Sequence, residues 1–195
     1  FGANYDLSVE SPTDALAGLS ARSHVRQQGI TDRSRQIARD RRVGAVAIQG
    51  SGTIDVDGDP VLAASLRQVE GRVRPVVRSG RAPVGRDEIA LGPALARRLG
   101  VSPGNRVRVM RRSMVVVGTV LDSSSTTPNH AEGALLSAAT LRSLTAGDSY
   151  YEVVLVRFRP GVDVAEATRA LDHRYPFGIM DESRPTPPPA LRNIE

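Results

Sequence analysis

The sequence contains no cysteine, no tryptophan and no lysine, and these absences limit what the chain can do. Without cysteine there can be no disulfide, no thiolate metal site and no cysteine nucleophile. Aromatic residues make up only 4% of the chain, too few for the stacking platform of a single-strand-binding protein. The arginines are spread from Arg22 to Arg192, whereas a nucleic-acid-binding surface normally gathers its basic residues in one patch.

Long hydrophobic runs are also missing. The longest, from Met114 to Leu121, is far shorter than the roughly 20 apolar residues of a membrane-spanning helix. The chain starts at Phe1 without an initiator methionine and stops at Glu195. We therefore expect a fragment of a longer protein, of the kind cut from between two membrane spans.

The remaining composition is that of a globular protein. The chain has 195 residues, 40% of them hydrophobic, and a net charge of +5. That length can bury a core and suits one domain of two lobes, or two small domains.

The most informative stretch runs from Gly80 to Val120. Its segment EIAL (88–91) is expected to form a strand, and Gly92 then serves as the N-cap of a helix with Pro93 at its first position. Apolar residues recur every four positions at Leu91, Leu95 and Leu99, which predicts one buried helix face.

The second half of this stretch predicts a turn and a hairpin. Gly100 is expected to end the helix in the left-handed conformation, and Pro103-Gly104 fits the centre of a type II turn. Residues 106–110 alternate basic and apolar side chains, which predicts a strand buried on one face. Residues 114–120 are almost wholly apolar, which predicts a strand buried on both faces.

The phrase GRAPVGRDEIALGPALARRLGVSPGNRVRV, followed by VVVGTV, resembles the extracytoplasmic domain of FtsX/MacB-type ABC transporter permeases. That family carries GR-x-P, E-[IV]-A-L-G, A-x-x-L-G, V-G-D-x-V-x-V and V-V-G-x-V motifs. One departure is Gly104-Asn105 where the family has Gly-Asp, and asparagine does similar work in turns. The signature positions are Gly80, Arg81, Pro83, Glu88, Leu91, Gly92, Leu99, Gly100, Gly104 and Gly118.

The resemblance implies a location and a set of partners. Such domains stand on the extracellular or periplasmic side of the cell membrane, between the first and second membrane spans. The implied partners are the chain's own transmembrane helices, a second permease copy and a separate ATP-binding subunit. An extracytoplasmic protein, lipoprotein or lipid is a further implied partner, and no nucleic acid and no cofactor is implied.

The first part of the chain predicts helices and a β-meander. We expect a strand at 5–9, a helix around Leu16 to Val25 that Asp14 caps, and a second, polar helix that starts at Thr31 or Asp32 and runs to Arg42. Three strands should follow at 43–49, 53–56 and 61–69, with Gly50-Ser51-Gly52 and Asp57-Gly58 as turns. Residues 71–80 are expected to cross over without regular structure because of Pro75.

The last part predicts elements with clear boundaries. Residues 134–137 should form a strand, Ser137 should cap a helix over 138–144, and 151–158 should form a strand. Asp163 and Glu166 predict the start of another helix, and 177–180 a last strand.

The order of elements predicts an α+β fold of two lobes. Residues 1–79 and 148–184 should form an α/β sandwich lobe from both chain ends. Residues 80–147 should form a smaller, β-rich lobe inserted in the middle. Residues 185–195, with three consecutive prolines, should be an extended linker towards a membrane helix.

No catalytic, metal-binding or cofactor-binding motif emerges. The three histidines, His24, His130 and His173, lack partners at metal-ligand spacing. The acidic segment at 55–59 fails the calcium-loop pattern, because Leu66 stands where a bidentate glutamate is needed. The sequence therefore predicts a domain without catalysis, and ATP hydrolysis is expected in a separate subunit.

Three functions are consistent with the sequence. The first is the permease domain, coupling ATP hydrolysis to an exported lipoprotein, lipid or peptide, or to an extracytoplasmic partner. The second is a stand-alone extracytoplasmic protein- or peptide-binding module, and the third, less favoured by the charge pattern, binds nucleic acid. Partner contacts are expected on the polar segment 122–133, at Ser123, Ser124, Ser125, Asn129 and His130. Arg81 and Glu88 are expected to fix the junction between the lobes, through a salt bridge or backbone hydrogen bonds.

Overall fold

The computed structural model describes residues 5–9, 23–121, 131–145, 150–175 and 182–183, and its fold is α+β, as predicted. None of the helices in these ranges is both long and apolar enough to cross a membrane. The helices are α1 (Ser23–Ala38), α2 (Pro93–Arg98), α3 (Ala138–Leu144) and α4 (Val164–Arg174). The strands are β1 (Leu7–Val9), β2 (Val43–Val56), β3 (Asp59–Glu70), β4 (Val76–Gly80), β5 (Glu88–Leu91), β6 (Arg106–Val109), β7 (Arg112–Leu121), β8 (Ala134–Leu136), β9 (Tyr151–Phe158) and β10 (Glu182–Ser183).

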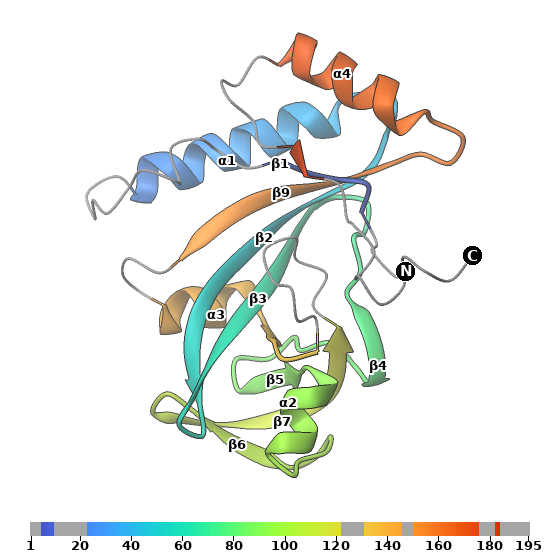
Figure 1. Ribbon diagram of the computed structural model, residues 1–195. Helices are drawn as coiled ribbons and strands as arrows, with labels where there is room; N and C mark the ends of the chain where they lie inside the picture. Colours follow the sequence, from blue (N-terminus) through green and yellow to red (C-terminus); the bar gives the residue numbers. More distant parts are fainter. Residues whose placement is uncertain (1–4, 10–22, 122–130, 146–149, 176–181, 184–195) are drawn as a thin grey trace.

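The strands form one mixed sheet. Their order is β10-β1-β9-β2-β3-β8-β5-β7-β4, and β6 pairs with β7 and with the end of β2. The pairs β3–β8 and β5–β7 are parallel, and the others are antiparallel. Segments from both ends of the chain thus share one edge of the sheet, while the middle of the chain builds the other (Figure 1).

The long hairpin of β2 and β3 runs through the whole molecule (Figure 1). Its strands pair from Val46 opposite Glu70 to Val56 opposite Asp59. The turn consists of Asp57 and Gly58, both with positive φ (52° and 97°), as the sequence predicts for an Asp-Gly hairpin.

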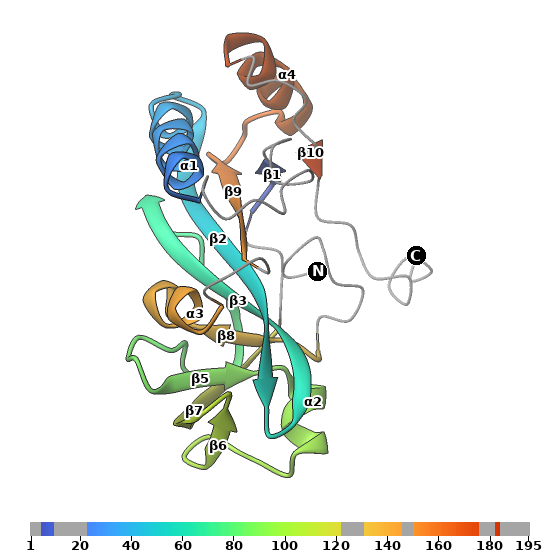
Figure 2. The same ribbon diagram turned by 90° about the vertical axis from the view of Figure 1, so that its left-hand side faces the viewer.

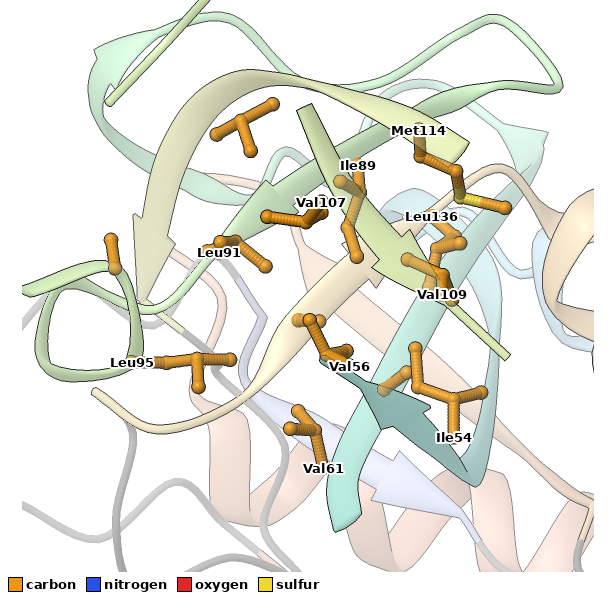
Figure 3. Close-up of a cluster of buried hydrophobic side chains, with 14 of the residues drawn as sticks. Ile54, Val56, Val61, Ile89, Leu91, Leu95, Val107, Val109, Met114 and Leu136 are labelled. Atoms are coloured by element: carbon orange, nitrogen blue, oxygen red, sulfur yellow. The ribbon is translucent and has the colours of Figure 1, made fainter. Parts of the chain in front are cut away.

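Two large hydrophobic cores lie at the two ends of this hairpin. In the first, α1 and α4 cover β1, β9 and the first half of β2 (Figure 2), and Val46, Ile48 and Leu171 belong to it. In the second, the tip of the hairpin packs against β5 to β8, α2 and α3. Figure 3 shows this second core, in which Ile54, Val56, Val61, Ile89, Leu91, Leu95, Val107, Val109, Met114 and Leu136 converge.

The predicted three-stranded meander is wrong, because Gly50, Ser51 and Gly52 lie inside β2. Gly50 pairs with Ser65 on β3 and with Glu152 on β9. A Cβ atom on Gly50 would lie 2.2 Å from the Tyr150 hydroxyl. The glycine therefore makes room for an aromatic side chain, and two neighbouring strands hold the backbone straight where sequence alone suggests a turn.

The predicted helix start at Thr31 or Asp32 is also wrong, because both lie inside α1. The Ser34 hydroxyl donates to the carbonyl of Thr31 at 2.7 Å, a contact within one helical turn. Burial of Ile30 and Ile37 against the sheet stabilises the helix through this polar stretch. The helix ends at Ala38 and does not reach Arg42.

Two strand predictions need smaller corrections. Residues 71–80 are not wholly irregular, because β4 starts at Val76; Pro75 stands just before the strand and removes no ladder hydrogen bond. β7 is fully buried on one face only, at Met114, Val116, Gly118 and Val120, while the residues between them are half-buried.

The predictions for the last part of the chain are confirmed where the structure describes it. β8, α3 and β9 match their predicted ranges within one residue. The Ser137 hydroxyl accepts the N–H of Thr140 at 3.3 Å, and the Asp163 carboxylate accepts the N–H of Glu166 at 2.9 Å. Each side chain is thus the N-cap of its helix. The strand predicted at 177–180 and the linker at 185–195 lie outside the described residues.

We propose that the two cores correspond to the two predicted lobes. One core unites α1, α4 and the strands from both chain ends, and the other unites most of residues 80–147. The tip of the β2–β3 hairpin, although it belongs to the first part of the chain, packs in the second core. The hairpin is therefore shared by both lobes.

Asp40 ties together α1, β2 and α4. Its buried carboxylate accepts the Arg42 guanidinium at 2.9 and 2.8 Å and the Arg42 N–H at 3.0 Å. Arg174 on α4 lies 3.8 Å from the same carboxylate. The Arg42 hydrogen bond is the main cause that lowers the pKa of Asp40 to about 2, against the opposing effect of burial.

The low pKa of Asp40 predicts that the folded protein loses stability in acid, and that Asp40→Asn removes this dependence on pH. A carboxyl with a lowered pKa stabilises the folded state fully above its unfolded pKa of about 4, and this contribution disappears as the pH falls towards about 2. We expect Asp40→Asn to lower the free energy of unfolding by about 2 kcal/mol at neutral pH, with the difference from wild type vanishing near about pH 2. Urea unfolding across this pH range measures the effect.

Asp32→Asn is the matched control, because Asp32 is an exposed carboxylate that pairs with Arg35 at 3.4 Å. It should lower the free energy of unfolding by less than about 1 kcal/mol at neutral pH, because an exposed ion pair contributes little. If the difference in the free energy of unfolding between wild type and Asp40→Asn stays constant with pH, the stabilisation does not come from the charge of Asp40.

Candidate functional site

Arg81 and Glu88 form the expected ion pair. The Arg81 guanidinium donates to the two carboxylate oxygens of Glu88 at 2.9 and 2.5 Å. The same carboxylate accepts the N–H groups of Val84 and Gly85, each at 2.9 Å. The Arg81 hydrogen bond and then these backbone bonds lower the pKa of Glu88 well below its usual range. The pair closes the segment between β4 and β5, and its carboxylate is not free to act as a base.

Gly92 is required by a close backbone approach. It is the N-cap of α2 with an ordinary φ of −61°, which any residue can adopt. A Cβ atom there, however, would lie 2.1 Å from the carbonyl oxygen of Ala131. That oxygen accepts the N–H groups of Ala94 and Leu95, at 2.9 and 3.3 Å. Gly92 thus lets the chain that follows residues 122–130 bind to the start of α2.

Gly100 and Gly104 are required by their backbone conformation. Gly100, with a φ of 65°, follows α2, and its N–H donates to the carbonyl of Arg97 at 3.1 Å. The N–H of Val101 donates to Ala96 at 3.0 Å, which completes a Schellman cap. Gly104 has a φ of 100°, as the third position of a type II turn requires.

The other signature residues have packing roles. Gly80 and Gly118 lie opposite each other in the β4–β7 pair, and a Cβ atom on Gly118 would lie 2.4 Å from the Arg81 carbonyl. Leu91 belongs to the second core, and Leu99 packs against it. Pro83 is buried as well. The signature therefore holds β4, β5, α2 and β7 together.

Arg98 makes contacts that no sequence motif indicated. From the last turn of α2 its guanidinium donates to Asp59 at the tip of the β2–β3 hairpin, at 3.2 Å. It also forms an ion pair with Glu132, directly after Ala131. Arg98 is half exposed and connects the hairpin tip to Glu132. Arg98 occupies an unspecified position of the A-x-x-L-G motif, and its two partners are distant in sequence.

A second unforeseen group lies where the two cores meet. Glu152 on β9 is 5% exposed, and its Oε1 accepts both the Arg142 guanidinium and the Tyr150 hydroxyl at 2.9 Å. The Arg142 guanidinium also lies over the Tyr150 ring, 5.7 Å from its centre. Burial, and then the charge of Glu152, raises the pKa of Tyr150 to about 12. In the described part of the chain, Glu152 Oε2 and Arg142 Nε have no hydrogen-bond partner.

The predicted partner-contact residues lie outside the described residues: Ser123, Ser124, Ser125, Asn129 and His130. The segment that carries them leaves from Leu121 at the end of β7 and returns at Ala131. His173 is exposed on α4, and His24 lies in α1. Within the described ranges no three histidine or acidic side chains are placed to hold a metal ion.

The fold and these contacts define a two-core α+β domain whose distinctive residues have structural roles. Known proteins with this fold belong to one class. The family model of the MacB-like periplasmic core domain matches residues 6–174. The fold is similar to that of the periplasmic region of MacB from Actinobacillus actinomycetemcomitans, with a TM-score of 0.59 and 12% identity over 94% of this chain and 89% of that one. The extracellular domain of the noncanonic ABC-type transporter YknZ from Gram-positive bacteria gives a TM-score of 0.51 and 13% identity over 88% of this chain and 94% of that one. No curated protein matches the sequence.

The chain belongs to the family of MacB-like periplasmic core domains. These are non-catalytic, extracytoplasmic domains of ABC transporter permeases, which work with membrane helices and an ATPase. The resemblance stated from the sequence is confirmed.

The close approach at Gly92 predicts a specific loss of stability. We expect Gly92→Ala to lower the free energy of unfolding by about 1–3 kcal/mol, because the added methyl group overlaps the Ala131 carbonyl, which is backbone and cannot rotate away. Urea unfolding monitored by circular dichroism measures the change.

Gly29→Ala is the matched control, because Gly29 lies in α1 and a Cβ atom there would meet nothing within 4 Å. The same substitution should stabilise the protein by up to about 1 kcal/mol, since alanine favours helix. Equal effects of the two variants would exclude the close approach as the cause.

Proposed function

We propose that this domain transmits ATP-driven conformational change across the membrane, to an exported lipoprotein, lipid or peptide or to an extracytoplasmic partner protein. The observation that carries the proposal is the β2–β3 hairpin, which is continuous through both cores. In this proposal, the lobe made from the two chain ends lies next to the membrane helices of the complete permease. A displacement there can be carried to the second lobe by the hairpin.

The paired strands support this role because they resist bending within the sheet. β2 hydrogen-bonds to β9 from Val43 to Ser51 and to β3 from Val46 to Val56. The two ladders overlap from Val46 to Ser51, so this part of β2 is paired with a strand on each side. Buried Glu152, with its half-buried partners Arg142 and Tyr150, flanks the hairpin where β9 begins.

One contact leads from the hairpin tip to the segment predicted to contact partners, and a second joins that segment to α2. Asp59 at the tip binds Arg98, which also binds Glu132. The Ala131 carbonyl binds the start of α2. The two contacts hold Ala131 and Glu132, which lie near the end of the predicted contact segment 122–133. In the proposal, movement of the hairpin tip repositions this segment.

The segment itself can be tested in the complete permease with its ATP-binding subunit. We expect simultaneous alanine substitution of Ser123, Ser124, Ser125, Asn129 and His130 to abolish transport or partner activation, while ATP hydrolysis and complex assembly persist. The control substitutes Gln36, Arg39 and Arg41, which are exposed on or just after α1, by alanine. Full activity of the five-residue variant would exclude this segment as the contact site.

The coupling through Arg98 predicts a separate effect. We expect Arg98→Gln to reduce transport at least about fivefold with unchanged ATP hydrolysis, because the hairpin tip loses its contact with Glu132. Arg97→Gln is the matched control; Arg97 is the exposed neighbour on α2 and makes no ion pair among the described residues. Equal transport by the two variants would contradict the proposed path.

A further inference from the structure

A small cavity in the second lobe is lined by basic and hydroxyl side chains. Its volume is about 130 Å³. Three separate elements form its wall: the segment before β5, the start of β7, and α3. The lining residues are Arg86, Arg112, Ala139, Thr140 and Ser143.

The two arginines at the cavity, Arg86 and Arg112, are not neutralised by a carboxylate among the described residues. Both are exposed, and neither makes an ion pair or a side-chain hydrogen bond within the part of the chain that the structure describes. By contrast, Arg81, Arg98 and Arg142 are each paired with a carboxylate. Asp87 follows Arg86 in the chain, is exposed, and makes no ion pair in the described ranges.

The wall of the cavity is held in place by hydrogen bonds. Thr140 is 2% exposed, and its hydroxyl donates to the Arg86 carbonyl at 3.1 Å. The Ser143 hydroxyl donates to the Thr140 carbonyl at 2.8 Å. The N–H of Val115 on β7 donates to the carbonyl of Asp87 at 2.8 Å. The backbone that carries Arg86 is therefore fixed between α3 and the strand that carries Arg112.

We propose that this cavity binds a phosphate group. Two guanidinium groups without acidic partners match the charge of a phosphate, and each can donate two parallel hydrogen bonds to its oxygens. A water molecule occupies about 30 Å³ in the liquid, so the cavity is large enough for a phosphate and the first atoms attached to it. The phosphate can belong to a lipid headgroup or to a soluble molecule, and the site does not depend on the proposed transmission role.

The first test measures binding of inorganic phosphate and glycerol phosphate to the 195-residue chain. Chemical-shift titration should give saturable changes at residues 86, 112 and 139–143. The double variant Arg86→Gln/Arg112→Gln should weaken binding at least about tenfold, because both guanidinium groups are lost.

The control is Arg41→Gln/Arg97→Gln, which removes the same total charge from two exposed positions outside the cavity. It should change the affinity less than about twofold. Equal weakening by both double variants, or shifts spread over the whole surface, would show attraction by net charge alone and overturn the proposal. All four arginines are exposed, so thermal unfolding should confirm that each variant folds.

Vesicles distinguish the two sources of the phosphate. A lipid headgroup is identified if the wild-type chain binds phosphatidylglycerol vesicles, the Arg86→Gln/Arg112→Gln variant does not, and both soluble phosphates bind weakly. Saturable binding of the soluble phosphates without vesicle binding identifies a small molecule. Absence of both kinds of binding in the wild-type chain would refute the site.

Discussion

The pairing of β2 with β3 is the interaction on which the other features depend. One face of β2 supplies Val46 and Ile48 to the first core and Ile54 and Val56 to the second. Because side chains alternate along a strand, a slip of one residue would turn all four away from both cores at once. The Asp57-Gly58 turn fixes the register from the closed end of the hairpin. Both cores therefore stabilise the same register of β2 against β3, and this pairing fixes the position of one core relative to the other.

Much of this fold could be predicted because many of its boundaries are local. The Ser137 and Asp163 caps, the Asp57-Gly58 turn and the strand at 151–158 depend on residues a few positions apart. The errors have a common cause in distant contacts. Gly50 suggests a turn until Tyr150, a hundred residues later, is seen to occupy the space that a side chain would fill. Thr31 likewise suggests a helix start until the sheet that buries its neighbours is known.

The same division applies to the candidate site. The Arg81–Glu88 pair could be predicted because seven residues separate its members within one motif. That Gly92 is the N-cap of α2 could be predicted as well, but the reason why it must be glycine could not, since that reason is the carbonyl of Ala131. Arg98, Arg142 and Glu152 were missed because an isolated charge in a helix or strand normally indicates a solvated surface. Only the tertiary structure shows that Glu152 is buried and that Arg98 has partners from two other elements.

The ion pair of Glu152 with Arg142 and the ion pairs of Arg98 differ in burial, and this difference suits a domain that changes conformation. Glu152 is buried, so separating it from Arg142 would leave a charge without solvent, and this cost favours a fixed arrangement where the cores meet. The ion pairs of Arg98 are solvated, and exposed pairs contribute little to stability because water replaces the lost contact. They can therefore break and reform without unfolding the lobe. In the proposed transmission, the rigid centre would carry the movement, and the exposed contacts at the hairpin tip would change during the cycle.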